Sequence, residues 1–175
     1  MRNRQAAVEN AGGGDLDQAP WWKNERGEWY VLVQGVLLVL VLAAPGFDRF
    51  AWGAPWSVAS FVAGDVLIIA GIVLGVAGVV GLGRNLTPLP HPKEDATLVE
   101  GGAYSLVRHP IYAGLAFAAV GCGLLWRSPA TLLLAALLLV FFDIKSRREE
   151  LWLAKIFPRY AEYQRRVKKL IPFVY

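Results

Sequence analysis

Four long apolar runs constrain most strongly what this chain can fold into. They cover residues 29–44, 57–82, 111–126 and 129–144. A helix that crosses the hydrocarbon core of a bilayer needs about 20 apolar residues, with about 17 as a lower limit. The second run is long enough by itself, and the other three reach this length only with flanking residues. With 55% hydrophobic and 18% charged residues, the chain is predicted to be all-α, a polytopic integral membrane bundle of about four transmembrane helices.

The basic residues alternate in number from one connection to the next. Four precede the first run, one separates the first from the second, three separate the second from the third, one separates the third from the fourth, and nine follow the fourth. Cytoplasmic loops of membrane proteins carry an excess of lysine and arginine. We therefore expect a multi-pass protein with both termini in the cytoplasm, and with residues 83–109 and 145–175 on that same side.

The polar ends of the chain are expected to behave differently from each other. Residues 1–28 are predicted to form a mobile tail ahead of a single domain at residues 29–175. Beyond Lys145, apolar residues recur every three or four positions between basic ones, which predicts an amphipathic helical segment on the cytoplasmic leaflet. Pro158 should break this segment into two helices, because proline removes a helical hydrogen bond.

Small residues recur at helical spacing in the second and third runs. Gly71 and Gly75 lie four residues apart, and Gly114, Ala118 and Cys122 repeat that spacing. Small side chains let two helices approach closely in lipid. The pattern predicts close packing of these two helices, or a narrow wall beside a bound ligand.

The segment "YSLVRHPIYAG", residues 104–114, joins the charged pair Arg108 and His109 to an apolar run. Pro110 suits the first position of a helix, and the residue before a proline is held extended. The free N–H groups at the start of this helix could face a ligand. A simple interfacial anchor is the alternative. The proline-rich connection before this segment is long enough to be functional or disordered.

The acidic residues near the predicted spans allow more than one interpretation. Glu149 and Glu150 could compensate the dipole of a cytoplasmic helix that begins there, with Lys145 paired to Glu149. Alternatively, one of them binds an ammonium group or a ribose hydroxyl of a cofactor. Asp65 and Asp143 lie in or beside spans, where carboxylates are functional candidates, and their roles stay open.

No metal and no nucleic acid are expected as partners. His91 and His109 are the only histidines and Cys122 is the only cysteine, which are too few for a metal site built from the usual ligands. The chain also lacks the two common glycine motifs that bind phosphate.

Three motifs in combination resemble the isoprenylcysteine carboxyl methyltransferase family, which is related to the membrane phospholipid N-methyltransferases. They are "GLGRNLTP" at 81–88, "LVEGGAYSLVRHPIYAG" at 98–114 and "REELWLAKIFPRYAEYQRRVKKLIP" at 148–172. The resemblance covers residues 81–175, the predicted cofactor core, and is that of a small prokaryotic-type member. It implies an integral membrane enzyme that uses S-adenosylmethionine, releases S-adenosylhomocysteine and binds this cofactor at the cytoplasmic face.

The resemblance also implies the residues of the site. The catalytic residues would be Arg108, His109 and Glu150. The cofactor-binding residues would be Leu98, Val99, Tyr104, His109, Pro110, Tyr112, Gly114, Glu149 and Glu150. The chain departs from the family in two places, because Pro158 replaces the glycine of an F-G-x-x-Y motif and "LLVFFDI" lacks an arginine of the eukaryotic members.

The function predicted on this basis is methyl transfer to a lipophilic acceptor, with membrane lipids as the other partners. A lipid-like acceptor would enter sideways between the second and third helices. The acceptor group stays open between a carboxylate, an amine and a thiol, and so does the oligomeric state. A non-catalytic membrane subunit of the same fold and an NADPH-dependent membrane reductase are the alternative functions.

Overall fold

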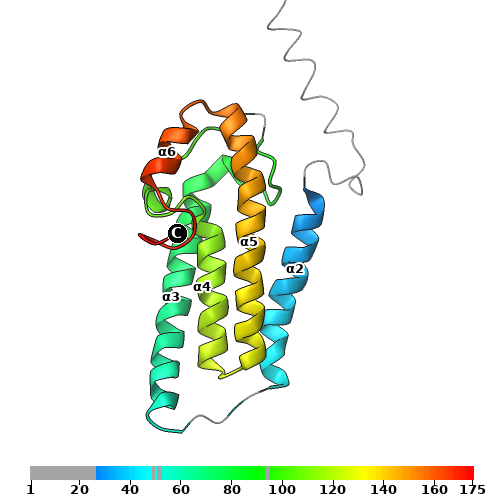
Figure 1. Cartoon of the computed structure of the whole chain (residues 1–175), viewed down its shortest axis with the longest axis vertical. Helices are drawn as coiled ribbons and strands as arrows, with labels where there is room; N and C mark the ends of the chain where they lie inside the picture. Colours follow the sequence, from blue (N-terminus) through cyan, green and yellow to red (C-terminus); the bar gives the residue numbers. More distant parts are fainter. Residues whose placement is uncertain (1–26, 49, 51–52, 94) are drawn as a thin grey trace, which may run out of the picture.

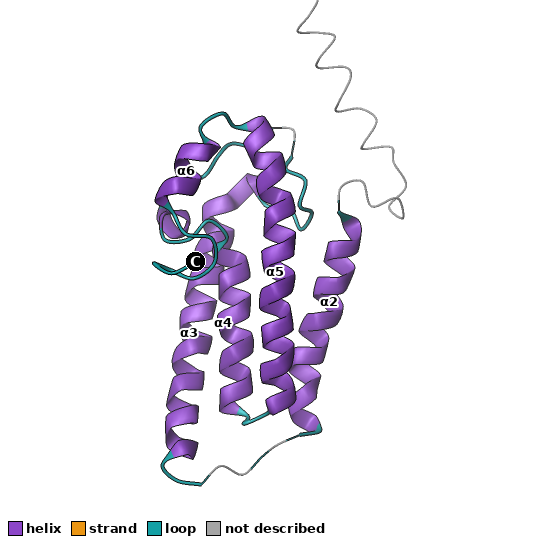
Figure 2. Cartoon of the chain, in the orientation of Figure 1, coloured by secondary structure: helices purple, strands orange, loops and turns teal. Residues whose placement is uncertain are grey.

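The computed structural model describes residues 27–48, 50, 53–93 and 95–175 (Figure 1). This part of the chain forms the helices α2 Glu28–Ala43, α3 Trp56–Leu82, α4 Pro110–Leu125, α5 Pro129–Ile156 and α6 Tyr160–Arg166. Loops and short 3-10 turns join them, and no strand occurs among the described residues (Figure 2). The all-α prediction is confirmed. Of the predicted tail, residues 1–26 lie outside the described residues, and Glu28 already belongs to α2.

Three helical segments are long and apolar enough to cross a membrane. They are Glu28–Gly46, Trp56–Asn85 and Pro129–Ile156. The helix α4 is apolar but has only 16 residues, which gives about 24 Å of helix against a hydrocarbon core of about 30 Å. Three of the four predicted spans therefore have the required length, and the third one falls short.

The four long helices pack as a bundle in which α3 lies along α4, α4 against α5, and α5 against α2 (Figure 1). Small residues make the contact between α3 and α4, as their spacing predicted. A Cβ atom on Gly71 would lie 2.5 Å from the carbonyl oxygen of Gly114, and one on Gly64 would lie 2.8 Å from that of Gly121. Since the two backbones touch, the path predicted for an acceptor between the second and third helices is wrong.

The helix α5 continues past the point where a new helix was predicted. It runs without a break over Pro129–Ile156, so Glu149 and Glu150 lie well inside it. The interpretation that these carboxylates compensate the dipole of a helix start is therefore wrong. The break expected at Pro158 is confirmed, because α6 begins only at Tyr160.

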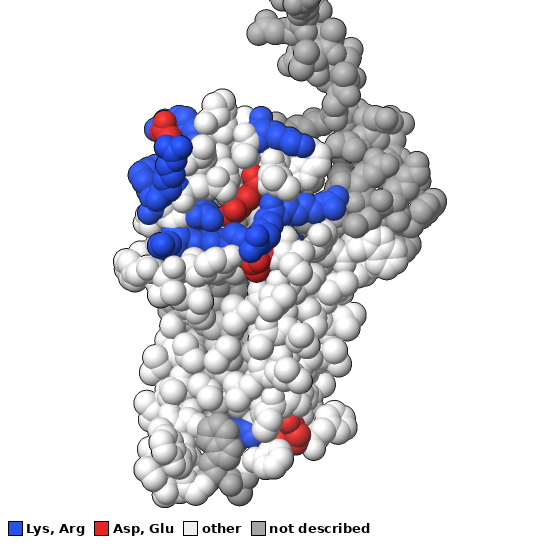
Figure 3. Space-filling view, viewed as in Figure 1, with Lys and Arg blue, Asp and Glu red and all other residues white. Residues whose placement is uncertain are grey.

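The chain after α5 folds back over the end of the bundle. Tyr160 and Tyr163 of α6 are buried, so this helix packs inward rather than lying only on a lipid surface. The segment that follows crosses the turn before α4, where Lys168 O accepts a hydrogen bond from Arg108 N at 2.8 Å and Lys169 O accepts one from His109 N at 3.1 Å. We call α6 and residues 167–169 the cap. Lysine and arginine side chains gather at this end of the molecule (Figure 3).

Asp143 anchors the cap to α5. Its Oδ1 accepts hydrogen bonds from Lys169 Nζ and from the Tyr175 hydroxyl, both at 2.7 Å, and its Oδ2 accepts one from Arg147 Nε at 2.7 Å. These contacts give Asp143 a structural role at the border of the apolar part of α5.

Candidate active site

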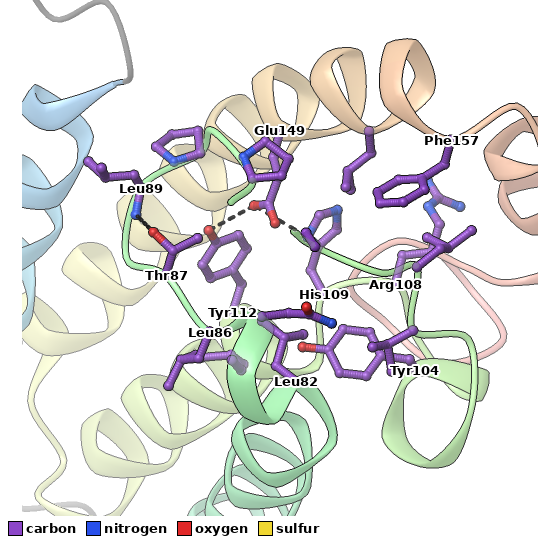
Figure 4. A pocket seen from close by; sticks show the side chains of 18 of the residues that line it. Leu82, Leu86, Thr87, Leu89, Tyr104, Arg108, His109, Tyr112, Glu149 and Phe157 are labelled. Atoms are coloured by element: carbon purple, nitrogen blue, oxygen red, sulfur yellow. Dashed lines mark hydrogen bonds and ion pairs between the residues drawn. The ribbon is translucent and has the colours of Figure 1, made fainter. Parts of the chain in front are cut away.

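A cavity of about 340 Å³ lies beneath the cap (Figure 4). The connection between α3 and α4, the start of α4, the last turns of α5 and the cap form its walls, and α2 contributes Gln34. Its size falls within the range of about 300–1,000 Å³ that small-molecule sites occupy. Seven of the predicted site residues line it, namely Leu98, Val99, Tyr104, Arg108, His109, Tyr112 and Glu149.

The other three predicted site residues do not line the cavity. Pro110 is the first residue of α4, as its fixed φ favours, and it packs against Gly78. Gly114 contacts the backbone of α3. Glu150 lies behind the turn that carries Arg108 and His109. In this structure these three support the cavity wall from behind, and their assignment as cofactor-binding residues stays a prediction.

Glu150 binds the turn before α4 and the cap together. Its Oε1 accepts a hydrogen bond from Arg108 Nε at 2.8 Å and lies 3.1 Å from His109 Nε2, and its Oε2 accepts one from Gln164 Nε2 at 3.1 Å. Arg108 Nη1 also donates to the carbonyl oxygens of Gln164 and Val167, at 3.2 and 2.5 Å. Glu150 is only 8% exposed as a residue, and such a buried charge is tolerated because it is paired and hydrogen-bonded.

Tyr112 holds the second glutamate in place at the cavity wall. Its ring stacks on the ring of His109, with centroids 5.5 Å apart, and on the ring of Phe142, with centroids 4.8 Å apart. Its hydroxyl donates a hydrogen bond to Glu149 Oε2 at 2.9 Å, and that oxygen lies 3.8 Å from His109 Nδ1 (Figure 4). The side chain of Glu149 keeps 25% of its surface exposed, so it can still meet a ligand.

Three tyrosines, Tyr104, Tyr160 and Tyr163, line the cap side of the cavity. The Tyr163 hydroxyl donates to Tyr104 O at 2.6 Å. The Tyr160 hydroxyl is buried without a hydrogen-bond partner among the described residues, although buried polar groups are normally paired. Burial, and after it the negative charge of Glu150, raises the pKa of Tyr160 well above its ordinary value. The phenol therefore stays a neutral donor, and because its hydroxyl is closed to solvent in this structure, a ligand in the cavity can reach it only when the cap shifts.

Burial is also the main reason that the pKa values of Tyr104 and Tyr163 are raised well above the ordinary value of a phenol. All three phenols stay protonated at neutral pH. The wall that they form beside Leu98 and Val99 is largely apolar and uncharged.

The sequence interpretation missed the importance of Tyr160, Lys145 and Gln34. The motif at residues 148–172 contains Tyr160 and Tyr163, but it gives no sign of which hydroxyl lacks a partner. Lys145 was expected to pair with Glu149 and does not form this ion pair. Its Nζ instead donates to Gln34 Oε1 at 2.6 Å and to Pro88 O at 3.1 Å.

Within the described residues, no three His, Cys, Asp or Glu side chains are grouped as metal ligands would be. His91 packs edge-on against Trp152, with ring centroids 4.6 Å apart.

Comparison with known proteins identifies the family of the chain. The family profile described as phospholipid methyltransferase matches residues 59–160. Protein-S-isoprenylcysteine O-methyltransferase A of Arabidopsis thaliana is 32% identical over 141 residues, which cover 78% of this chain and 68% of that protein. The cobalt-zinc-cadmium resistance protein CzcN of Cupriavidus metallidurans is 32% identical over 152 residues, which cover 86% of this chain. This chain spans 64% of the length of CzcN.

A solved structure shares the fold. The eukaryotic intramembrane Ras methyltransferase ICMT, an isoprenylcysteine carboxyl methyltransferase, has a TM-score of 0.58 to this chain at 22% identity, covering 86% of this chain and 54% of that one. The profile covers more than half of the sequence, and the relatives confirm the family predicted from the motifs. This chain therefore belongs to the phospholipid methyltransferase family and resembles, within it, the isoprenylcysteine O-methyltransferases.

Proposed function

We infer that this protein is an integral membrane methyltransferase that transfers a methyl group from S-adenosylmethionine to a lipophilic acceptor. A cavity of suitable size, lined by seven of the predicted site residues in a member of a methyltransferase family, carries this proposal most directly. Beside the cavity lies the Tyr160 hydroxyl, a buried donor of a residue that is 1% exposed, without a hydrogen-bond partner among the described residues. A donor kept in that position without a protein acceptor is costly unless a ligand pairs with it.

The residues that line the cavity fit S-adenosylmethionine. Leu98, Val99 and Tyr104 would cover the adenine with a largely apolar surface. Glu149 would accept hydrogen bonds from the ammonium group or from the ribose hydroxyls, and Tyr160 would donate one. When bound, S-adenosylmethionine supplies a methyl group on a positively charged sulfonium, which makes that carbon electrophilic.

The protein's own contribution would be to position the reactants and to exclude water. Methyl transfer from a sulfonium needs close, in-line approach of the acceptor, so positioning accounts for much of the rate. Arg108, Glu150 and the cap fix the turn before α4, and this turn sets the places of His109 and Tyr112 in the wall.

His109 is poorly suited to take a proton from the acceptor. It is 5% exposed, its Nε2 lies 3.1 Å from Glu150 Oε1, and its Nδ1 lies 3.8 Å from Glu149 Oε2. A general base must reach the proton that it removes, whereas both ring nitrogens here are directed at carboxylates. This arrangement favours an acceptor that reacts without losing a proton, such as a carboxylate.

The proposed membrane topology has α2 to α5 as four spans, both termini in the cytoplasm and the cavity at the cytoplasmic face. The basic residues gathered at the cap end support this orientation (Figure 3), because basic residues are enriched on the cytoplasmic side. The short helix α4 would also cross the membrane. The turn before it would reach one membrane–water interface, and Trp126 after it would reach the other.

Ligand binding by the purified protein in detergent tests the proposal against its alternatives. S-adenosylhomocysteine should bind in a calorimetric titration and raise the unfolding temperature, and NADPH should do neither. The opposite result would favour a membrane reductase. Membranes that contain the protein should also incorporate radiolabelled methyl groups from S-adenosylmethionine into extractable lipophiles. S-adenosylhomocysteine binding without any incorporation would favour a non-catalytic subunit.

A further inference from the structure

Lys145 places a buried cation at the wall of the cavity. The residue is 1% exposed, and both Lys145 and Gln34 line the cavity. Its Nζ donates to the neutral oxygens of Gln34 and Pro88, at 2.6 and 3.1 Å. An ammonium group has three N–H donors, so one of them remains for another acceptor.

No carboxylate of the described residues forms an ion pair with this cation. Glu149 lies four residues further along the same helix, but its Oε2 accepts the hydrogen bond of Tyr112 at 2.9 Å and faces His109 Nδ1 at 3.8 Å. The Tyr112 ring, with its centroid 5.0 Å from Lys145 Nζ, offers only a weak cation–π contact. Glu149 therefore acts on this charge only through space, and the described residues supply no carboxylate in direct contact with it, although a buried charge is normally paired.

Gln34 is a polar side chain in an apolar stretch of α2. From residue 31 to residue 43, α2 reads "VLVQGVLLVLVLA", in which Gln34 is the only polar side chain. Its Oε1 accepts the hydrogen bond of Lys145, which leaves the two N–H donors of its amide available. An ammonium and an amide side by side can donate to both oxygens of one carboxylate.

We propose that Lys145 and Gln34 form a carboxylate-binding subsite, which holds the acid group of the lipophilic methyl acceptor. The inference rests on the proposed function and adds the residues that select the acceptor. Leu82, Leu86, Leu89 and Ile111 line the same cavity and give it an apolar wall for the rest of such a molecule.

The position of the subsite favours the acceptor over the cofactor as the source of the carboxylate. Gln34 comes from α2, whereas Tyr160 comes from α6, and these helices lie on either side of α5 in Figure 1. A cofactor held near Tyr160 leaves the side near α2 to the second substrate. The amino-acid part of S-adenosylmethionine also carries a carboxylate, so the experiment has to distinguish the two sources.

The test compares acids with matched neutral ligands in three variants. N-acetyl-S-farnesylcysteine and its carboxamide differ at the acid group, and S-adenosylhomocysteine and methylthioadenosine differ by the amino-acid part. Lys145→Gln removes the cation, Gln34→Glu supplies an internal carboxylate that competes with the ligand, and Lys145→Arg keeps the charge as a control. Gln34→Glu should fold even if Lys145→Gln does not, because it leaves the buried cation paired.

The wild-type protein should bind the farnesylated acid at least about tenfold more tightly than the amide, as expected for a hydrogen bond to a charged group. Lys145→Gln and Gln34→Glu should abolish this preference and leave the affinities for both adenosine ligands unchanged, whereas Lys145→Arg should keep most of it. Binding of all ligands is measured by calorimetry on folded, monodisperse protein.

Two results would overturn the assignment in different ways. If the variants weaken S-adenosylhomocysteine binding but not methylthioadenosine binding, the subsite holds the cofactor's carboxylate and the acceptor assignment is wrong. Gln34→Glu could also leave two preferences unchanged, that for the farnesylated acid over its amide and that for S-adenosylhomocysteine over methylthioadenosine. In that case there is no carboxylate subsite at Lys145. Failure of the wild-type protein to bind S-adenosylhomocysteine would instead refute the proposed function itself.

Discussion

Replacing Tyr160 by phenylalanine should stabilise the ligand-free protein and weaken its binding of S-adenosylhomocysteine at the same time. The hydroxyl belongs to a residue that is 1% exposed, and it has no partner among the described residues. Burying an unpaired polar group costs about 1–3 kcal/mol. Phenylalanine keeps the ring and removes that cost, so we expect a gain of about 1 kcal/mol, or about 3 °C in unfolding temperature.

The same hydroxyl is expected to find its partner in the bound ligand. Its loss should therefore remove about 1–2 kcal/mol of binding free energy, which corresponds to a decrease in affinity of about 5- to 30-fold. Thermal unfolding in detergent and calorimetric titration with S-adenosylhomocysteine measure the two effects on the same samples.

Tyr163→Phe is the matched control, since it removes an identical hydroxyl from the same short helix. That hydroxyl donates to Tyr104 O at 2.6 Å, so its removal should destabilise the ligand-free protein by about 1 kcal/mol. The two substitutions should thus shift the unfolding temperature in opposite directions. A Tyr160→Phe protein that unfolds below the wild type, or that binds S-adenosylhomocysteine as tightly, would refute the reasoning.

Three further predictions concern stability and can be checked by unfolding in detergent. Gly71→Ala should lower the free energy of unfolding by roughly 1–3 kcal/mol, because the new Cβ would lie 2.5 Å from a backbone oxygen of α4. Gly35→Ala, in open space, should instead raise it by up to about 1 kcal/mol. Equal effects of the two substitutions would contradict the packing of α3 on α4. Arg108→Ala should cost roughly 3 kcal/mol because it removes the arginine partner of the buried Glu150 carboxylate and leaves only His109 and Gln164 beside it. Arg147→Ala, from an exposed ion pair, should cost much less. Burial raises the pKa values of the cavity tyrosines, so the stability that they contribute is present below pH of about 10 and falls as pH rises further; stability that increases above that pH would contradict this.

The sequence was sufficient to predict the helices because the information on them is local. The apolar runs gave the four long helices, and Pro110 and Pro158 gave one start and one break. The small-residue spacing gave the contact between α3 and α4, because helices in lipid approach where side chains are small. The prediction failed near Glu149, where a change from apolar to charged residues did not end α5.

The contacts of the site depend on pairs that are distant in the sequence. Arg108 lies 42 residues from Glu150, and Lys145 lies 111 residues from Gln34. The motif brought Glu150 to attention as a cofactor ligand, but only the packing of the cap shows that its two oxygens are already occupied. Local spacing also predicted the wrong partner for Lys145. Helical spacing suggested Glu149, whereas the tertiary fold provides Gln34.

The backbone hydrogen bonds from Arg108 and His109 to residues 168 and 169 have a consequence for how the molecule opens. They join two segments that lie about 60 residues apart, so undocking of the cap removes both of these bonds from the turn before α4 at once. Regions held by few long-range contacts tend to open as one unit, at a lower free energy than the rest of a structure. Mild heating should therefore release this unit and empty the cavity while the four long helices remain assembled, and binding capacity should be lost before helical content.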